Sequence, residues 1–151
     1  MGAWGPALYS DDIACDVRDD FRDLVGDGLS GEEASNRLLQ EWSSELDDSD
    51  SGPVFWLALA DTQWRCGRLE PRVKARAEAI IADKSDLARW QEDPSLLRKR
   101  EAVLAKLAEK LASPPPPPKK LPKRFRNHCD WAVGELIAYE LLSGQKVIFR
   151  V

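Results

Sequence analysis

Apolar side chains recur every three or four positions over most of residues 1–112, which is the pattern of amphipathic helices. The pattern predicts helices over residues 11–25, from Ser30 to Leu46, from Pro53 to Gly67, from Pro71 onward, over residues 85–90 and over residues 93–112. The clearest start is at Ser30 and Glu33, a capping box in which each side chain can bond the other residue's backbone N–H. Val54 to Ala60 is apolar on nearly every side, so we expect it at the centre of a helical bundle.

The pattern changes after residue 113. Pro114 to Pro118 cannot be helical and predict a stiff polyproline II spacer. Residues 136–141 and 147–151 are largely apolar and flank a loop that contains Gly144, which predicts a two-stranded β hairpin. We therefore predict a mainly α fold, with a bundle of five or six helices in residues 1–113, a polyproline and basic linker in residues 114–127, and a β hairpin or partial β module in residues 128–151.

The expected hairpin raises a question of stability. Two strands alone are marginally stable in water, and both of these strands are largely apolar. The hairpin could pack on the helices, pair with another chain, or belong to a β module that is cut short at Val151. We favour the third interpretation and expect weak order or an intermolecular strand contact in this region.

Charge is distributed unevenly along the chain. Residues 1–50 carry 14 acidic and 3 basic side chains, whereas residues 94–151 carry 5 acidic and 12 basic ones, so the net charge of −4 conceals a strong polarity. Such polarity steers partners and sets salt dependence, but it does not define a fold. It favours an interaction with a charged partner.

Composition excludes several classes of protein. No stretch approaches the roughly 20 apolar residues of a membrane span, and the N-terminus lacks the basic and apolar regions of a secretory signal. The three cysteines, Cys15, Cys66 and Cys129, are odd in number and widely spaced, which indicates reduced thiols rather than disulfides or a zinc site. We therefore expect a cytoplasmic protein with no membrane partner, no metal and no cofactor.

Catalytic motifs are also missing from the sequence. There is no GxSxG, GxGxxG or GxxxxGK[ST] pattern, and the single histidine, His128, excludes HExxH. His128 and Cys129 are adjacent in an extended segment, so their side chains point to opposite sides and cannot easily share a proton. We predict no catalytic residue from these patterns.

The first helix carries the most prominent acidic surface. Asp12, Asp16, Asp19 and Asp23 follow helical spacing and should lie close to one face. We interpret them first as a solvated helix surface and second as a docking surface for a basic partner; a divalent-metal cluster and a DNA-mimicking surface are lesser alternatives. Trp4 lies in a loop bounded by glycine and proline; we expect it to pack back onto the bundle, with an exposed binding anchor as the alternative.

Two further groups are candidate sites. Asp61 and Gln63 interrupt the most apolar helix, where a buried carboxylate needs hydrogen-bond partners; we interpret them first as a structural polar network and second as a functional site. A basic segment follows the prolines, and it is typical of a solvated linker, although it could contact phosphates. Its basic residues are Lys119, Lys120, Lys123, Arg124 and Arg126.

Two resemblances carry family information. The opening Met1-Gly2-Ala3-Trp4-Gly5, the string Phe55-Trp56-Leu57-Ala58-Leu59-Ala60-Asp61-Thr62-Gln63-Trp64 and the following Gly67-Arg68-Leu69 resemble an uncharacterised bacterial family that opens with Met-Gly-Ala/Thr-Trp-Gly. The likeness covers about residues 1–112 and implies a fold but no activity. The tail from Cys129 to Tyr139, with Phe149-Arg150-Val151, is similar to the start of a small β-barrel in bacterial immunity proteins; Glu135 stands where those proteins usually have Asp.

The sequence as a whole favours a non-enzymatic protein-binding module, with neutralisation of a toxin in the bacterial cytoplasm as its specific form. The partner surface would be the acidic side of the first helix together with the N-terminal loop. One alternative is a carboxylate-based enzyme with its site near Asp61, which a polar pocket and a raised pKa of Asp61 would support. Another is a nucleic-acid-associated protein that uses Lys119–Arg126, which the acidic N-terminal half disfavours. The pattern identifies neither the protein partner nor the oligomeric state.

Overall fold

The computed structural model describes residues 3–124 and 132–150 of the chain. Their elements are α1 (Asp12–Gly26), α2 (Gly31–Glu41), α3 (Ser43–Leu46), α4 (Ser51–Arg65), α5 (Pro71–Asp83), the 3₁₀ helix η1 (Ser85–Trp90), α6 (Pro94–Ala112), β1 (Leu136–Glu140) and β2 (Lys146–Arg150). The predicted fold class, a helical bundle followed by a short antiparallel hairpin, is confirmed. Within the described residues, no helix is both long enough and apolar enough to cross a bilayer.

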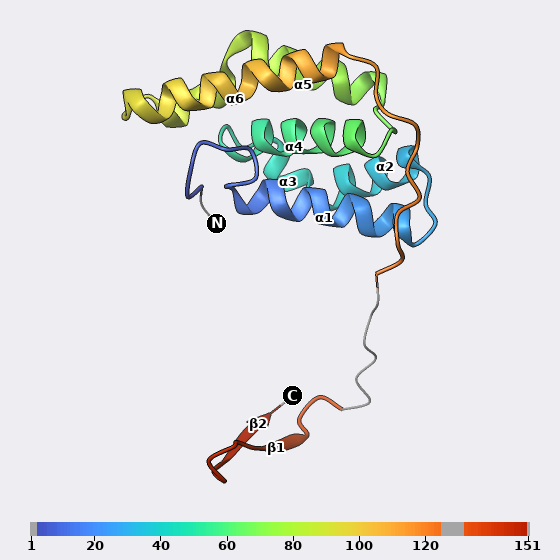
Figure 1. Cartoon of the computed structure of the whole chain (residues 1–151), viewed down its shortest axis with the longest axis vertical. Helices are drawn as coiled ribbons and strands as arrows, with labels where there is room; N and C mark the ends of the chain where they lie inside the picture. The colour runs from blue at the N-terminus through green and yellow to red at the C-terminus, as the bar shows by residue number, and fades with distance from the viewer. Residues whose placement is uncertain (1–2, 125–131, 151) are drawn as a thin grey trace.

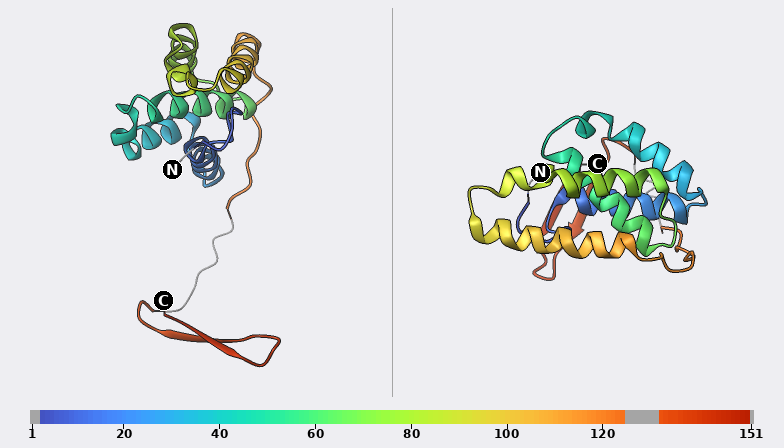
Figure 2. Two further views of the ribbon diagram at one scale, coloured as in Figure 1. Left: turned by 90° about the vertical axis from the view of Figure 1, so that its left-hand side faces the viewer. Right: turned by 90° about the horizontal axis from the view of Figure 1, so that it is seen from above.

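Helix α4 is the centre of the helical body, which we define as residues 3–112. It lies between a layer formed by α1, α2 and α3 and a layer formed by α5 and α6 (Figure 1), and Figure 2 shows the same arrangement from two other sides. Helix α4 carries apolar side chains on nearly every side, so it can be covered by both layers. Its residues Val54, Phe55 and Leu57 to Ala60 are completely buried. The sequence prediction for this segment is confirmed.

Local signals fix the start of the first two helices. Asp11 caps α1: its side chain accepts a hydrogen bond from the Ile13 N–H at 3.0 Å. The predicted capping box of Ser30 and Glu33 is present at α2. The expected helix from Ser30 to Leu46 is divided, because the chain bends at Trp42, whose ring packs 6.0 Å from that of Phe55.

The N-terminal loop closes over the body through Leu8, not through Trp4. Leu8 is buried in the core, whereas 65% of Trp4 is exposed, so the expectation that Trp4 packs back onto the bundle is wrong. The physical reason is the closure of the loop by the Trp4 N–H, which donates to the Ser10 carbonyl at 2.9 Å. This closure directs Leu8 inward and leaves the indole of Trp4 in solvent.

A buried ion pair joins the second layer to this loop. The guanidinium of Arg100 in α6 donates two hydrogen bonds to the carboxylate of Asp86 in η1, at 2.6 and 2.7 Å. Both side chains are almost completely buried. A third hydrogen bond from Arg100 reaches the Pro6 carbonyl at 3.1 Å, so one residue connects α6, η1 and the N-terminal loop.

Residues 113–124, here called the strap, run along the helical body instead of leaving it (Figure 1). The Lys119 N–H donates to the Cys66 carbonyl at 3.1 Å, and Arg68 donates to the Lys119 carbonyl at 2.7 Å. Two glycines permit the approach, since a Cβ on Gly26 would lie 2.4 Å from the Pro122 carbonyl oxygen and one on Gly67 would lie 2.3 Å from that of Pro116. The described part of the expected spacer is therefore docked on the helices.

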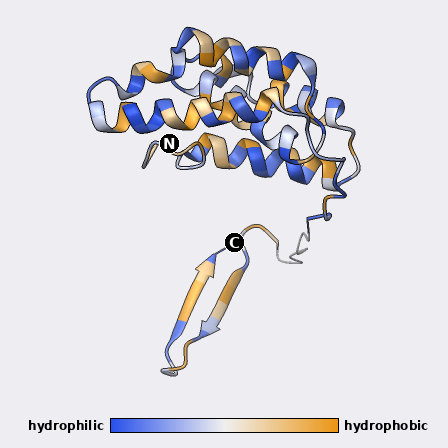
Figure 3. Ribbon diagram, turned by 45° about the horizontal axis from the view of Figure 1, so that its top comes forward, coloured by the Kyte–Doolittle hydropathy of each residue, from blue (hydrophilic) through white to orange (hydrophobic). Residues whose placement is uncertain are grey.

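The hairpin has two chemically different faces. Residues directly opposite each other in an antiparallel pair share a face, so Ile137, Phe149, Tyr139 and Val147 form one face. The other face contains Leu136, Ala138 and Ile148 together with Arg150, Glu140 and Lys146. Figure 3 shows apolar colour along both strands, and every residue of the two strands is exposed or half-buried. The helices therefore do not cover the hairpin.

Candidate functional site

Asp61 is the centre of a polar cluster inside the helical body. Its side chain is almost fully buried near the C-terminal end of α4. One carboxylate oxygen accepts hydrogen bonds from the Tyr9 hydroxyl at 2.7 Å and from Arg65 Nε at 2.6 Å, and the other accepts one from Lys110 Nζ at 2.6 Å. The Tyr9 hydroxyl also lies 3.1 Å from Thr62 Oγ1. The cluster thus fastens the N-terminal loop to α4 and α6.

The electrostatics of this cluster oppose acid–base catalysis. Burial alone would raise the pKa of Asp61, but hydrogen bonds from Lys110, Tyr9 and Arg65 outweigh it and hold the pKa below its usual value. Burial and the neighbouring Asp61 charge raise the pKa of Tyr9 well above its usual value, so the hydroxyl remains a neutral donor. A general base needs a pKa near the working pH and an accessible lone pair. Asp61 has a lowered pKa and three donors already bound to it.

Gln63 belongs to a separate network. Its amide nitrogen donates to Ser35 Oγ at 2.7 Å and to Glu70 Oε1 at 2.8 Å, and its amide oxygen accepts from the Glu70 N–H at 3.0 Å. These bonds join α4 to α2 and to the residue before α5. The structure therefore does not bring Gln63 and Asp61 together in one site.

Two cavities share Tyr9 and Arg65 in their linings. One, of about 300 Å³, is lined by Tyr9, Arg18, Arg22, Thr62, Arg65, Cys66, Lys119 and Leu121. The other, of about 270 Å³, lies between the N-terminal loop, α4 and α6 and includes Asp61 and Lys106. Burial raises the pKa of the Cys66 thiol in the first cavity, which makes it a poor nucleophile at neutral pH.

The acidic residues of α1 occupy different environments. Asp16 is exposed, Asp12 lies in the first turn of the helix, and Asp19 pairs with Arg18 at 2.8 Å. Asp23 pairs with Arg124 of the strap at 2.6 Å, across 101 positions of sequence. Part of the acidic surface that the sequence predicts as a docking site therefore meets the basic segment of the same chain.

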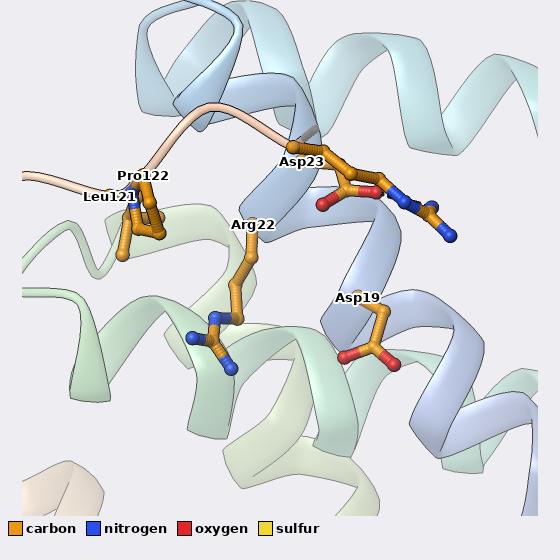
Figure 4. A pocket seen from close by; sticks show the side chains of 6 residues that line it. Asp19, Arg22, Asp23, Leu121 and Pro122 are labelled. Atoms are coloured by element: carbon orange, nitrogen blue, oxygen red, sulfur yellow. Dashed lines mark hydrogen bonds and ion pairs between the residues drawn. The ribbon is translucent and has the colours of Figure 1, made fainter. Parts of the chain in front are cut away.

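Figure 4 shows where the strap passes this part of α1. Leu121 and Pro122 lie across a cavity from Arg22, Asp19 and Asp23, and the Arg22 side chain extends away from Asp23. The hydrogen bond from Arg18 holds the pKa of Asp19 below its usual value. Asp19 is therefore charged at neutral pH, and Asp23 forms the ion pair with Arg124 of the strap.

The basic segment does not form one continuous surface. Arg124 is paired with Asp23, Lys119 lines the cavity beside Tyr9, and Lys120 and Lys123 are exposed. Arg126, His128 and Cys129 lie outside the described residues. In the part of the chain that the structure describes, no three His, Cys, Asp or Glu side chains converge as a metal-binding group.

No protein-family model, curated protein or solved structure matches the chain. The family and immunity-protein resemblances therefore stay predictions.

Sequence reasoning missed two groups of residues. The first is the apolar hairpin face, where Tyr139 is 61% and Phe149 is 56% exposed. The alternation within each strand could have indicated it, but only the pairing register assigns Ile137 and Val147 to the same face. The second is the pair of basic residues Arg22 and Lys119, which are distant in sequence but line the same cavity. No local sequence signal links them.

Proposed function

We propose that this protein is a non-enzymatic binding module that recognises a partner protein through its β hairpin. The observation that carries the proposal is the exposed face formed by Ile137, Tyr139, Val147 and Phe149. Aromatic side chains bury roughly 150–250 Å² each and dominate interface energetics. A two-stranded sheet that keeps such a face in water gains stability when another surface covers it.

The proposed partner contributes β structure with an apolar side. In the described residues, β1 and β2 pair with each other and with no other strand, so each has one free edge of backbone N–H and C=O groups. Free edges accept an added strand, and the alternating side chains then supply specificity. An edge and an apolar face presented together favour strand addition over a contact made by charge alone.

The acidic surface of α1 and the N-terminal loop would contribute a second, weaker contact. Asp16 and Trp4 are exposed on the helical body, and Asp12 lies on the same helix. An acidic surface favours a basic partner, and rim charges of this kind mainly affect the association rate. A protein toxin in the bacterial cytoplasm is the partner class that the tail's resemblance to immunity proteins implies.

Capture with matched variants tests the proposal. The full chain and the double variant Tyr139→Ser/Phe149→Ser would each be used to capture proteins from lysate at low and high salt. We expect one stoichiometric protein with the original chain, its loss with the double variant, and its retention with Lys99→Gln, an exposed change on α6. Retention by the double variant, or recovery of only a second copy of this chain, would contradict the proposal.

A further inference from the structure

The cavity of about 300 Å³ beside Tyr9 has an unusual lining, and it is independent of the hairpin. Four of its eight lining residues are basic and none is acidic. The basic residues come from three segments that are distant in sequence: Arg18 and Arg22 from α1, Arg65 from α4 and Lys119 from the strap. The buried Thr62 and Cys66 also contribute to its lining.

The four cations divide into two kinds. Arg18 is paired with Asp19, and Arg65 is paired with Asp61. Arg22 and the Lys119 ammonium have no hydrogen-bond or ion-pair partner among the described residues. The charges of Arg22, Arg68, Lys119 and Arg65 each act to lower the pKa of the Cys66 thiol, although burial outweighs them. Arg22 and Lys119 therefore line one cavity without a directly bonded partner, while the charge of Asp19 also attracts Arg22 from the neighbouring cavity.

Donor groups remain on the paired arginines as well. A guanidinium has five N–H donors. Arg18 uses Nε and Nη2 on Asp19, and Arg65 uses Nε on Asp61, so at least one terminal nitrogen of each is left for another acceptor. Donors that approach from several directions suit a tetrahedral dianion with several acceptor oxygens better than a single planar carboxylate.

We propose that this cavity is a binding site for a small phosphate-bearing molecule, held between Arg22 of α1 and Lys119 of the strap. Its volume lies at the lower end of the roughly 300–1,000 Å³ usual for small-molecule sites, which favours a compact ligand. Because Lys119 and Leu121 form one wall, a bound phosphate also bridges the strap to the helical body. Ligand binding and strap docking should therefore stabilise each other.

Calorimetric titration tests the binding site. The full chain would be titrated with sodium pyrophosphate in a low-chloride buffer, beside Arg22→Gln, Lys119→Gln and the exposed control Lys99→Gln. We expect each cavity variant to weaken binding about tenfold, the effect of losing one charge-assisted hydrogen bond, and the control to leave it unchanged. Absence of binding to the folded original chain, or equal weakening by all three variants, would overturn the proposal.

Two further measurements identify the ligand class and the role of the strap. Pyrophosphate should slow tryptic cleavage at Lys119–Arg124 several-fold in the original chain, whereas sodium chloride at equal ionic strength should not. Lys119→Gln should abolish the protection at Lys123 and Arg124, and unchanged cleavage would overturn the bridge. A single-stranded oligonucleotide that binds more tightly than pyrophosphate and competes with it would assign the site to nucleic acid, and would overturn the small-molecule assignment.

Discussion

The helical body and the β hairpin place polar and apolar groups in opposite ways. In the body, even fully buried charges have partners: Arg100 with Asp86, and Asp61 with three donors. In the hairpin, Tyr139 and Phe149 remain more than half exposed. These buried charges of the body are paired within the chain, whereas the apolar side chains of the hairpin remain uncovered.

This difference separates scaffold from recognition surface. A buried ion pair satisfied on all sides fixes the positions of helices and offers little to a ligand. An apolar face without cover still has hydrophobic free energy to gain from association. The strap lies between these extremes, because its backbone is bonded to the body while Lys120 and Lys123 stay exposed.

The largest effect should come from breaking the buried ion pair. Arg100→Met leaves the Asp86 carboxylate buried without its cation and should cost about 3–5 kcal/mol of unfolding free energy. Urea denaturation followed by circular dichroism measures this loss. Lys99→Met, an exposed neighbour on the same helix, is the control and should change stability by less than about 0.5 kcal/mol. Similar losses for the two variants would contradict the assigned role of the pair.

A smaller loss should follow removal of the Asp61 charge. Asp61→Asn weakens three hydrogen bonds to a buried acceptor and should cost about 2 kcal/mol at pH 7. The folded pKa of Asp61 lies below its usual value of 3.8, so its contribution is present above that value and is lost as the pH falls through the folded pKa. Urea denaturation at pH 7, 4 and 3 should therefore show that the difference in unfolding free energy between the variant and the original chain becomes smaller at acidic pH. A difference that widens there would contradict the ion-pair account.

The docked strap can be tested with a single methyl group. Alanine in place of a helical glycine normally stabilises a helix by roughly 0.5–1 kcal/mol, but a Cβ on Gly26 would meet the Pro122 carbonyl at 2.4 Å. Gly26→Ala should therefore leave overall stability within about 1 kcal/mol while accelerating tryptic cleavage at Lys119–Arg124 several-fold. Gly31→Ala, where the nearest atom is Arg68 Cβ at 3.4 Å, is the matched control. Equal cleavage of the two variants would show that the strap is not held at Gly26.

The hairpin should be the region least coupled to folding of the body. Tyr139→Ser/Phe149→Ser should alter the unfolding free energy of the helices by less than about 0.5 kcal/mol, because the structure shows no extensive contact between these strands and the helices. Denaturation monitored by tryptophan fluorescence checks this expectation. A destabilisation comparable to that of Arg100→Met would mean that the hairpin belongs to the folded core.

Local signals explain which parts of the fold could be predicted. Some helix starts depend only on interactions within a few residues, so they could be predicted from the sequence. These are the starts at the capping box of Ser30, at Pro71 and at Pro94. The interruption of the apolar pattern at Asp61 identified a polar network but not its members. Tyr9 and Lys110 lie 52 and 49 positions away from it, and no local pattern links residues so distant.

The position of the strap could be predicted only in part from the sequence. Five prolines correctly excluded a helix, yet docking depends on the absence of side chains at Gly26 and Gly67 and on the pair of Arg124 with Asp23. The charge polarity of the sequence favoured a charged partner. It could not specify that part of this charge is paired inside one chain.

Site-specific photo-crosslinking from the hairpin tests the central claim most directly. Benzoylphenylalanine would replace Tyr139 on the apolar hairpin face or, as control, Lys99 on α6, in cells that produce the protein. The account predicts one discrete adduct between this chain and a different protein from position 139, its loss when Phe149→Ser is added, and no such adduct from position 99. Crosslinks from position 139 that fall only on the helices of the same chain, or the same products from both positions, would contradict it.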